Sequence, residues 1–77
     1  MSRTFQDESF RVWEVYPSGN RFGYSEDPAL IFHCLTDRSV RPRHITFDGD
    51  EADAERAVGD ASVDRLIELL GQATDLR

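Results

Sequence analysis

His33 and Cys34 are neighbours in this chain, and their types could carry nucleophilic catalysis. A cysteine becomes a nucleophile when a nearby histidine or other cation stabilises its thiolate. The two residues lie in an apolar run typical of a strand, where consecutive side chains point to opposite faces. The same alternation places His44 on the face opposite Cys34. We therefore interpret Cys34 as a small core residue and predict that the protein is not an enzyme. An enzyme using His33, Cys34 or His44 is the alternative.

Metal ligands at a suitable spacing are not found. A zinc site takes about four ligands, and His33, Cys34 and His44 show none of the usual short spacings. Residues 48–55 are acidic, but a calcium loop starting at Asp48 would need glycine at its sixth position and glutamate at its twelfth. The chain has Asp53 and Gly59 there. We interpret the segment as the solvated start of a helix, and we predict neither a metal nor another cofactor.

One basic cluster stands out in an acidic chain. Its members are Arg38, Arg41, Arg43 and His44. Arginine holds phosphate and carboxylate groups through paired hydrogen bonds, so this cluster could bind a small anion or a nucleotide. The alternative is that the cluster neutralises nearby acidic groups and protects the edge of a strand from pairing.

The overall charge limits the partners. Nine arginines and no lysine stand against 15 acidic residues, which gives a formal charge of −6. A surface that binds nucleic acid needs a positive face, so we expect no nucleic-acid partner. The most apolar stretch, residues 29–35, is much too short to span a membrane. The lone cysteine excludes an internal disulfide, and the first residues have no apolar segment typical of a signal peptide. We therefore expect a cytoplasmic protein.

The elements that position these residues follow from two periodicities. Residues 9–16, 29–36 and 41–47 are rich in aromatic and β-branched residues and predict strands, and residues 21–24 could add a short one. Short connections favour an antiparallel meander. Residues 51–58 predict a short helix that ends at Gly59. Ser62 is a suitable N-cap for a second helix, whose apolar stripe comprises Val63, Leu66, Ile67, Leu70 and Ala73.

These elements predict a two-layer α+β fold. Its sheet is an antiparallel meander of three or four strands, and the C-terminal helix packs on one face. We expect residues 1–8 to be a flexible N-terminus and residues 9–77 to form a single small domain, because 77 residues are too few for two. One sheet face should contain Trp13, Val15, Leu30, Phe32, Cys34, Ile45 and Phe47.

The opposite face is the candidate interaction surface. It collects Phe10, Val12, Ile31 and Leu35, together with Tyr16, His33, His44 and Thr46. One helix covers one face only, so this second face is predicted to be apolar and partly exposed. Residues 1–8 or 51–58 could instead fold over it and close it.

The order of three core triplets resembles a family of small bacterial proteins of unassigned function. The triplets are residues 13–15, 30–32 and 43–45, and a leucine-rich helix ending at Ala73 follows them. The resemblance covers most of the chain from residue 10 onward. It implies a fold of a sheet and a helix, and it implies no activity.

Three functions are consistent with these observations. The first is a non-catalytic interaction module that associates with itself or with another protein, through the apolar sheet face or a strand edge. The second is binding of a small anion or nucleotide at the basic cluster. The third is the enzyme described above. The mass of the protein in solution separates the first from the other two.

Overall fold

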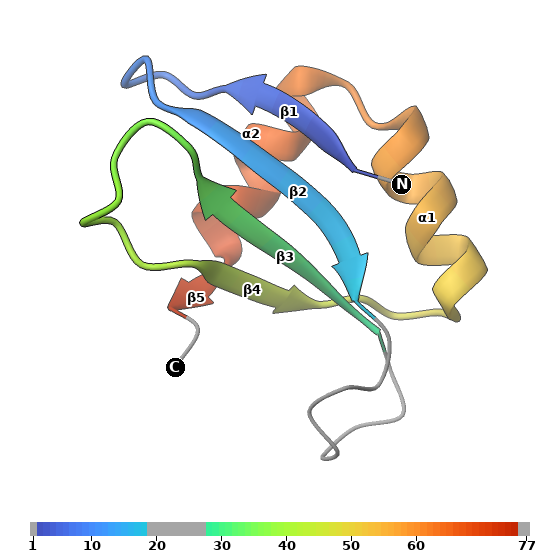
Figure 1. The fold of residues 1–77 in the computed structure, drawn as a ribbon. Helices are drawn as coiled ribbons and strands as arrows, with labels where there is room; N and C mark the ends of the chain where they lie inside the picture. The colour runs from blue at the N-terminus through green and yellow to red at the C-terminus, as the bar shows by residue number, and fades with distance from the viewer. Residues whose placement is uncertain (1, 19–27, 76–77) are drawn as a thin grey trace.

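Every strand of the sheet lies beside the strand that precedes or follows it along the chain (Figure 1). The computed structural model describes residues 2–18 and 28–75. The antiparallel sheet has the order β1 (Arg3–Gln6), β2 (Val12–Ser18), β3 (Ala29–Cys34), β4 (Arg43–Thr46) and β5 (Thr74–Asp75). Two helices, α1 (Glu51–Asp60) and α2 (Val63–Gln72), lie between β4 and β5 in the sequence. The α+β class and the antiparallel sheet are therefore confirmed.

The number of elements differs from the prediction. The sequence predicts three or four strands and two helices, of which only the C-terminal one is predicted to pack on the sheet. The described residues contain five strands, and the two helices are both present. The first extra strand is β1, which lies within the segment predicted to be flexible and places Phe5 opposite Trp13. The second is β5, a two-residue strand directly after α2. β1 has a single apolar residue, Phe5, and β5 has none, so neither shows a period of two in the sequence. The strand predicted at residues 21–24 lies outside the described residues.

Pro17 belongs to β2, just beyond the end of the strand predicted at residues 9–16. Backbone groups along an antiparallel strand point alternately to its two neighbours. The amide of Leu35 donates to the carbonyl of Val12, so even-numbered residues of β2 bond to β3. Pro17 therefore faces the other side, beyond the stretch of β2 that pairs with β1. Its missing N–H therefore costs no ladder hydrogen bond to any described residue, which explains why a proline is tolerated within this strand.

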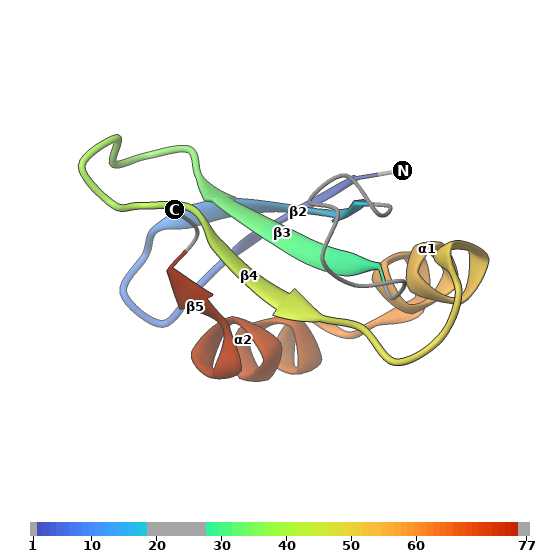
Figure 2. The same cartoon turned by 90° about the horizontal axis from the view of Figure 1, so that it is seen from below.

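Both helices lie on the same side of the sheet (Figure 2). The core between the two layers contains Phe5, Trp13, Val15, Leu30, Phe32, Ala54, Val58, Leu66, Leu70 and Ala73. Cys34, Ile45 and Phe47 are partly buried against it. The predicted composition of this sheet face is thus confirmed, because the register pairs Trp13 with Cys34 and Leu30 with Ile45.

Local capping explains where the helices begin. The carboxylate of Asp50 accepts the amide of Asp53, and the side chain of Asp53 accepts the amide of Asp50 in return. Ser62 caps α2 by accepting the amide of Arg65, as predicted. The helix α1 continues through Gly59 to Asp60 rather than ending at the glycine. Neither described helix has the length and apolar character needed to cross a membrane.

Arg3 ties the first strand to the helical layer. Its guanidinium donates to the carbonyl of Val58, 3.1 Å away, and to the carbonyl of Ala61. Both carbonyls lie where α1 ends and the chain turns towards α2, so Arg3 satisfies backbone acceptors that a helix end leaves open. The edge strand β1 is therefore attached to the helices as well as to β2.

Candidate functional site

The face of the sheet opposite the helices is not covered by any other described element (Figure 2). We call it the open face. Its residues alternate with those of the core and include Val12, Tyr16, Ile31, His33, His44 and Thr46, as the sequence predicts. Neither of the segments that could have closed this face does so. Within residues 1–8, β1 extends the sheet, and α1 joins α2 on the other side.

Ile31 lies at the centre of the open face and is only 2 % exposed. Its cross-strand neighbours are Tyr16 on β2 and His44 on β4. The hydroxyl of Tyr16 lies 3.0 Å from Nε2 of His33, and the two rings stack with centroids 5.7 Å apart. Ile31 is therefore inaccessible to a partner in this conformation, although it is one of the four residues of the predicted interaction face.

Phe10 has an unusual backbone conformation in the turn between β1 and β2. Its φ is 66°, in the left-handed region that glycine normally occupies. The amide of Phe10 donates to the carbonyl of Asp7, and the amide of Asp7 donates to the carbonyl of Arg11. This pattern fits a three-residue hairpin loop, in which the left-handed position is usually glycine. The side chain of Phe10 is nevertheless 80 % exposed. The position is therefore strained without any burial of the ring in return.

Three members of the predicted interaction face lie at the same end of the sheet. Leu35 follows β3 and is 52 % exposed, and its amide donates to the carbonyl of Val12. Phe10 stands two residues before Val12, in the adjacent turn. We call Phe10, Val12 and Leu35 the sheet-end patch. Among the described residues, the exposed large apolar side chains are Phe10, Leu35 and Val63, and the patch gathers two of them.

Asp7 holds this turn together through its carboxylate. One oxygen accepts the amides of Ser9 and Arg11, and the other accepts the indole N–H of Trp13 at 2.8 Å. Partial desolvation of the carboxylate opposes ionisation, but the hydrogen bonds from Trp13, Arg11 and Ser9 outweigh it. The pKa of Asp7 therefore lies below its ordinary value of 3.8. The ionised side chain fixes the turn that presents Phe10.

The basic cluster is divided between different surroundings. Arg38 and Arg41 are exposed in the connection between β3 and β4. Arg43 points to the helical side, donates to the carbonyl of Ala73 at 2.6 Å and lies 4.0 Å from the carboxylate of Asp75. His44 lies on the open face, opposite Ile31. The structure thus brings Arg43 and His44 to opposite faces of the sheet, and Arg43 already has an acceptor for its guanidinium.

His33 and Cys34 also lie on opposite faces. Cys34 is half-buried on the core side opposite Trp13, and its sulfur lies 3.7 Å from the hydroxyl of Thr36. His33 is on the open face with Tyr16. The described residues contain no group of three or more His, Cys, Asp or Glu placed to hold a metal ion.

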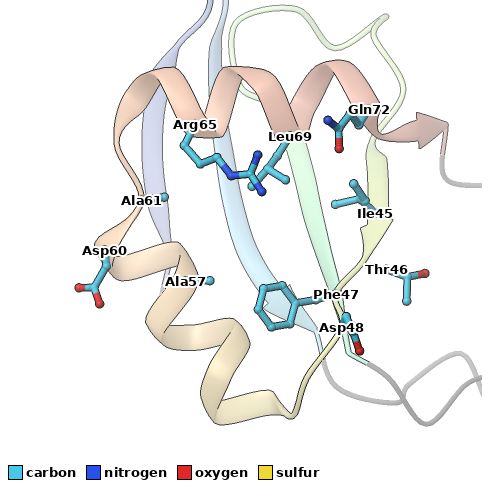
Figure 3. Close-up of a pocket in the computed structure, with 10 residues that line it drawn as sticks. All are labelled: Ile45, Thr46, Phe47, Asp48, Ala57, Asp60, Ala61, Arg65, Leu69 and Gln72. Carbon is cyan, nitrogen blue, oxygen red and sulfur yellow. The ribbon is translucent and has the colours of Figure 1, made fainter.

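A groove lies on the helical side, between α1, α2 and β4 (Figure 3). It has a volume of about 510 Å³. The ring of Phe47 and the side chain of Ala57 point into it (Figure 3). Its apolar lining comprises Ile45, Phe47, Ala57, Ala61 and Leu69, and its polar lining comprises Thr46, Asp48, Asp60, Arg65 and Gln72. Such a mixture of an apolar lining with a few polar groups is typical of binding sites.

Sequence reasoning does not find this groove or the strain at Phe10. Leu69 lies outside the predicted apolar stripe of α2, and Phe47 is predicted as an ordinary core residue. The sequence feature that could have predicted the groove is the pair Ala57 and Ala61, because two alanines four residues apart leave space beside a helix. The strain at Phe10 depends on the hairpin loop length, which the sequence did not define.

Comparison with known proteins adds no relative. No protein-family model, curated protein or solved structure matches the chain. The resemblance to a bacterial family therefore stays a prediction.

Proposed function

We propose that this domain is a non-catalytic protein-interaction module that associates with a second copy of itself through the sheet-end patch. The observation that carries the proposal is the exposed ring of Phe10 on a left-handed backbone. Such a conformation costs about 1–3 kcal/mol in a residue other than glycine. Within the monomer, burial of the ring does not offset this cost. Contact with a partner would bury the ring and so account for a phenylalanine at this position.

The rest of the patch supports an isologous contact, in which the same surface of two copies meets. Val12 and Leu35 lie beside each other at the end of the β2–β3 ladder, next to the turn that carries Phe10. In a two-fold contact each ring can pack against the partner's aliphatic side chains. The lone cysteine, Cys34, is consistent with a reducing compartment, and we propose a cytoplasmic location.

The charge of the chain gives the association a recognisable salt dependence. Two chains of charge −6 repel each other, and salt screens this repulsion. An apolar contact should therefore strengthen as the salt concentration rises, whereas a contact made by ion pairs would weaken. Sedimentation velocity at low and at high salt measures this difference. A protein that stays monomeric at millimolar concentration in both conditions would contradict self-association.

Phe10→Gly separates association from stability. Glycine adopts the left-handed conformation freely, so the variant monomer should be as stable as the wild type or more stable, by up to about 1 kcal/mol. It should nevertheless lose the dimer. Val63→Ser is the matched control, because Val63 is also exposed but lies at the start of α2, and this variant should associate normally. Equal association of Phe10→Gly and wild type would remove the patch from the interface.

A further inference from the structure

The edge of the sheet beside the groove is only partly occupied. β5 pairs with β4 at Arg43 and His44, and in the register of the described residues it does not reach Ile45 or Thr46. The strands are antiparallel, so the chain beyond Asp75 runs away from Thr46 rather than towards it. The free edge therefore begins at Thr46, the last residue of β4, and continues to Phe47, directly beside the groove between α1 and α2 (Figure 3).

The backbone of Thr46 points outwards from this free edge. The amide of Phe47 donates to the carbonyl of Pro28 at 2.8 Å, so Phe47 directs its backbone groups towards the preceding strand. Adjacent residues in an antiparallel ladder direct theirs to opposite sides. Thr46 therefore presents its N–H and C=O at the edge. This N–H is the donor, and this C=O the acceptor, to which the backbone of an added strand can bind.

We propose that the free edge of β4 binds a short extended segment of another protein, which adds a strand at Thr46 and inserts an apolar side chain into the groove. A residue paired with Thr46 would turn its side chain to the open face. Its neighbour on one side would lie opposite Phe47, with its side chain pointing to the helical side, into the apolar lining. On the other side, Ala73, the residue before β5, takes the place opposite Ile45. Hydrogen bonds to the backbone would give affinity, and the groove would select the side chain.

Charge identifies the flanking residues of this segment as basic. Asp48, just after β4, and Asp60, at the end of α1, both line the groove (Figure 3), and α1 itself carries four carboxylates and one arginine. That arginine, Arg56, is already paired with Asp53 at 2.7 Å. Arg65, the cation that lines the groove, is paired with Glu68. A bulky apolar residue with lysine or arginine close to it therefore complements both the lining and the rim. This site is separate from the sheet-end patch.

The proposal can be tested with a library of random heptapeptides displayed on phage. We expect selection on the wild-type domain to enrich sequences in which a bulky apolar residue has lysine or arginine within two positions. A synthetic peptide from the selection should protect the Thr46 amide from hydrogen exchange. Selection that enriches no such sequence, or a peptide that leaves the Thr46 amide unprotected, would overturn the proposal.

Two variants at one position test the backbone contact directly. Thr46→Pro removes the outward N–H but no hydrogen bond to β3, and we expect it to weaken peptide binding by about tenfold or more. Thr46→Val keeps the N–H and should bind as the wild type does. Unchanged binding by a folded Thr46→Pro variant would overturn the proposal. If the variant does not fold, protection of the Thr46 amide in the wild-type protein is the deciding measurement. Phe10→Gly should bind the peptide as the wild type does. Loss of peptide binding in this variant would place the peptide on the sheet-end patch and overturn the proposal.

Discussion

The guanidinium of Arg43 donates a hydrogen bond to the backbone carbonyl of Ala73, 2.6 Å away, at the point where α2 ends. The same side chain approaches Asp75 in the short strand that follows. Arg43 thereby joins the middle of the chain to its C-terminal end. The carbonyl of Ala73 lies at the end of the helix, where no backbone N–H of the helix can donate to it, and Arg43 supplies the missing donor. Arg43 also holds β5 against β4.

Arg43→Met should therefore lower the free energy of unfolding by about 1.5–3 kcal/mol, the usual range for a hydrogen bond made by a charged group. The ion pair with Asp75 should add little, because both side chains are partly exposed and 4.0 Å apart. Urea unfolding measures the change. Arg38→Met, at an exposed position of the same cluster, is the control and should change stability by less than about 0.5 kcal/mol. Equal effects would show that Arg43 has no special structural role.

Asp7 should make stability depend on pH in the acidic range. Its folded-state pKa is lowered, so its contribution is present above about pH 4 and is lost as the pH falls through the folded-state value. Asp7→Asn should thus be less stable than the wild type at neutral pH, and the difference should shrink in acid. The carboxyl titration of Asp7 by NMR provides a direct check. A pKa at or above the ordinary 3.8 would contradict the role of its hydrogen bonds.

Gly49 and Gly59 should respond in opposite directions to alanine. Gly49 has a φ of 145°, and a Cβ there would lie 3.0 Å from the ring of Phe47 and 3.1 Å from the carboxylate of Asp53. Gly49→Ala should cost about 1–3 kcal/mol and disturb the groove. Gly59 lies within α1 with no atom near its Cβ position, so Gly59→Ala should stabilise by about 0.5–1 kcal/mol. Thermal unfolding distinguishes the two, and a stabilising Gly49→Ala would contradict the strain.

Phe32 and Leu66 should be costly to truncate, because both are fully buried between the sheet and the helices. Replacing either with alanine should lower the free energy of unfolding by about 2–5 kcal/mol. Val63→Ala is the control, since Val63 is 45 % exposed at the first turn of α2. A loss below about 1 kcal/mol at both Phe32 and Leu66 would mean that α2 does not dock on this face.

The two periodicities of the sequence were sufficient to predict the layers and the composition of the core face. Trp13 and Val15 flank the polar Glu14, and Leu30 and Phe32 lie two residues apart on β3, so the face of each follows from its position. The same rule fails for β1, which has only one apolar residue, and for β5, which has none. These two strands form because tertiary contacts stabilise them, through Phe5 in the core and through Arg43 at the C-terminal end.

The candidate sites were less predictable, because they depend on which backbone groups and side chains remain accessible. The pattern places Ile31 on the open face correctly but cannot show that the side chain is buried there. It groups Arg43 with Arg38 and Arg41, whereas the acceptor at Ala73 lies 30 residues away along the chain. The free edge at Thr46 results from where β5 begins and ends, which is set by the end of α2.

The neighbouring order of the five strands also has a consequence for folding kinetics. The pairs from β1 to β4 form between segments that follow one another, so the contacts among them are comparatively local and can form early. The helices and β5, in contrast, contact β1 and β4 across long stretches of sequence, as the hydrogen bond from Arg3 to Val58 shows. We expect the meander to dominate the folding transition state and the helical layer to dock after it. Leu66→Ala should then mainly accelerate unfolding and leave the folding rate almost unchanged in stopped-flow measurements, whereas Phe32→Ala should slow folding.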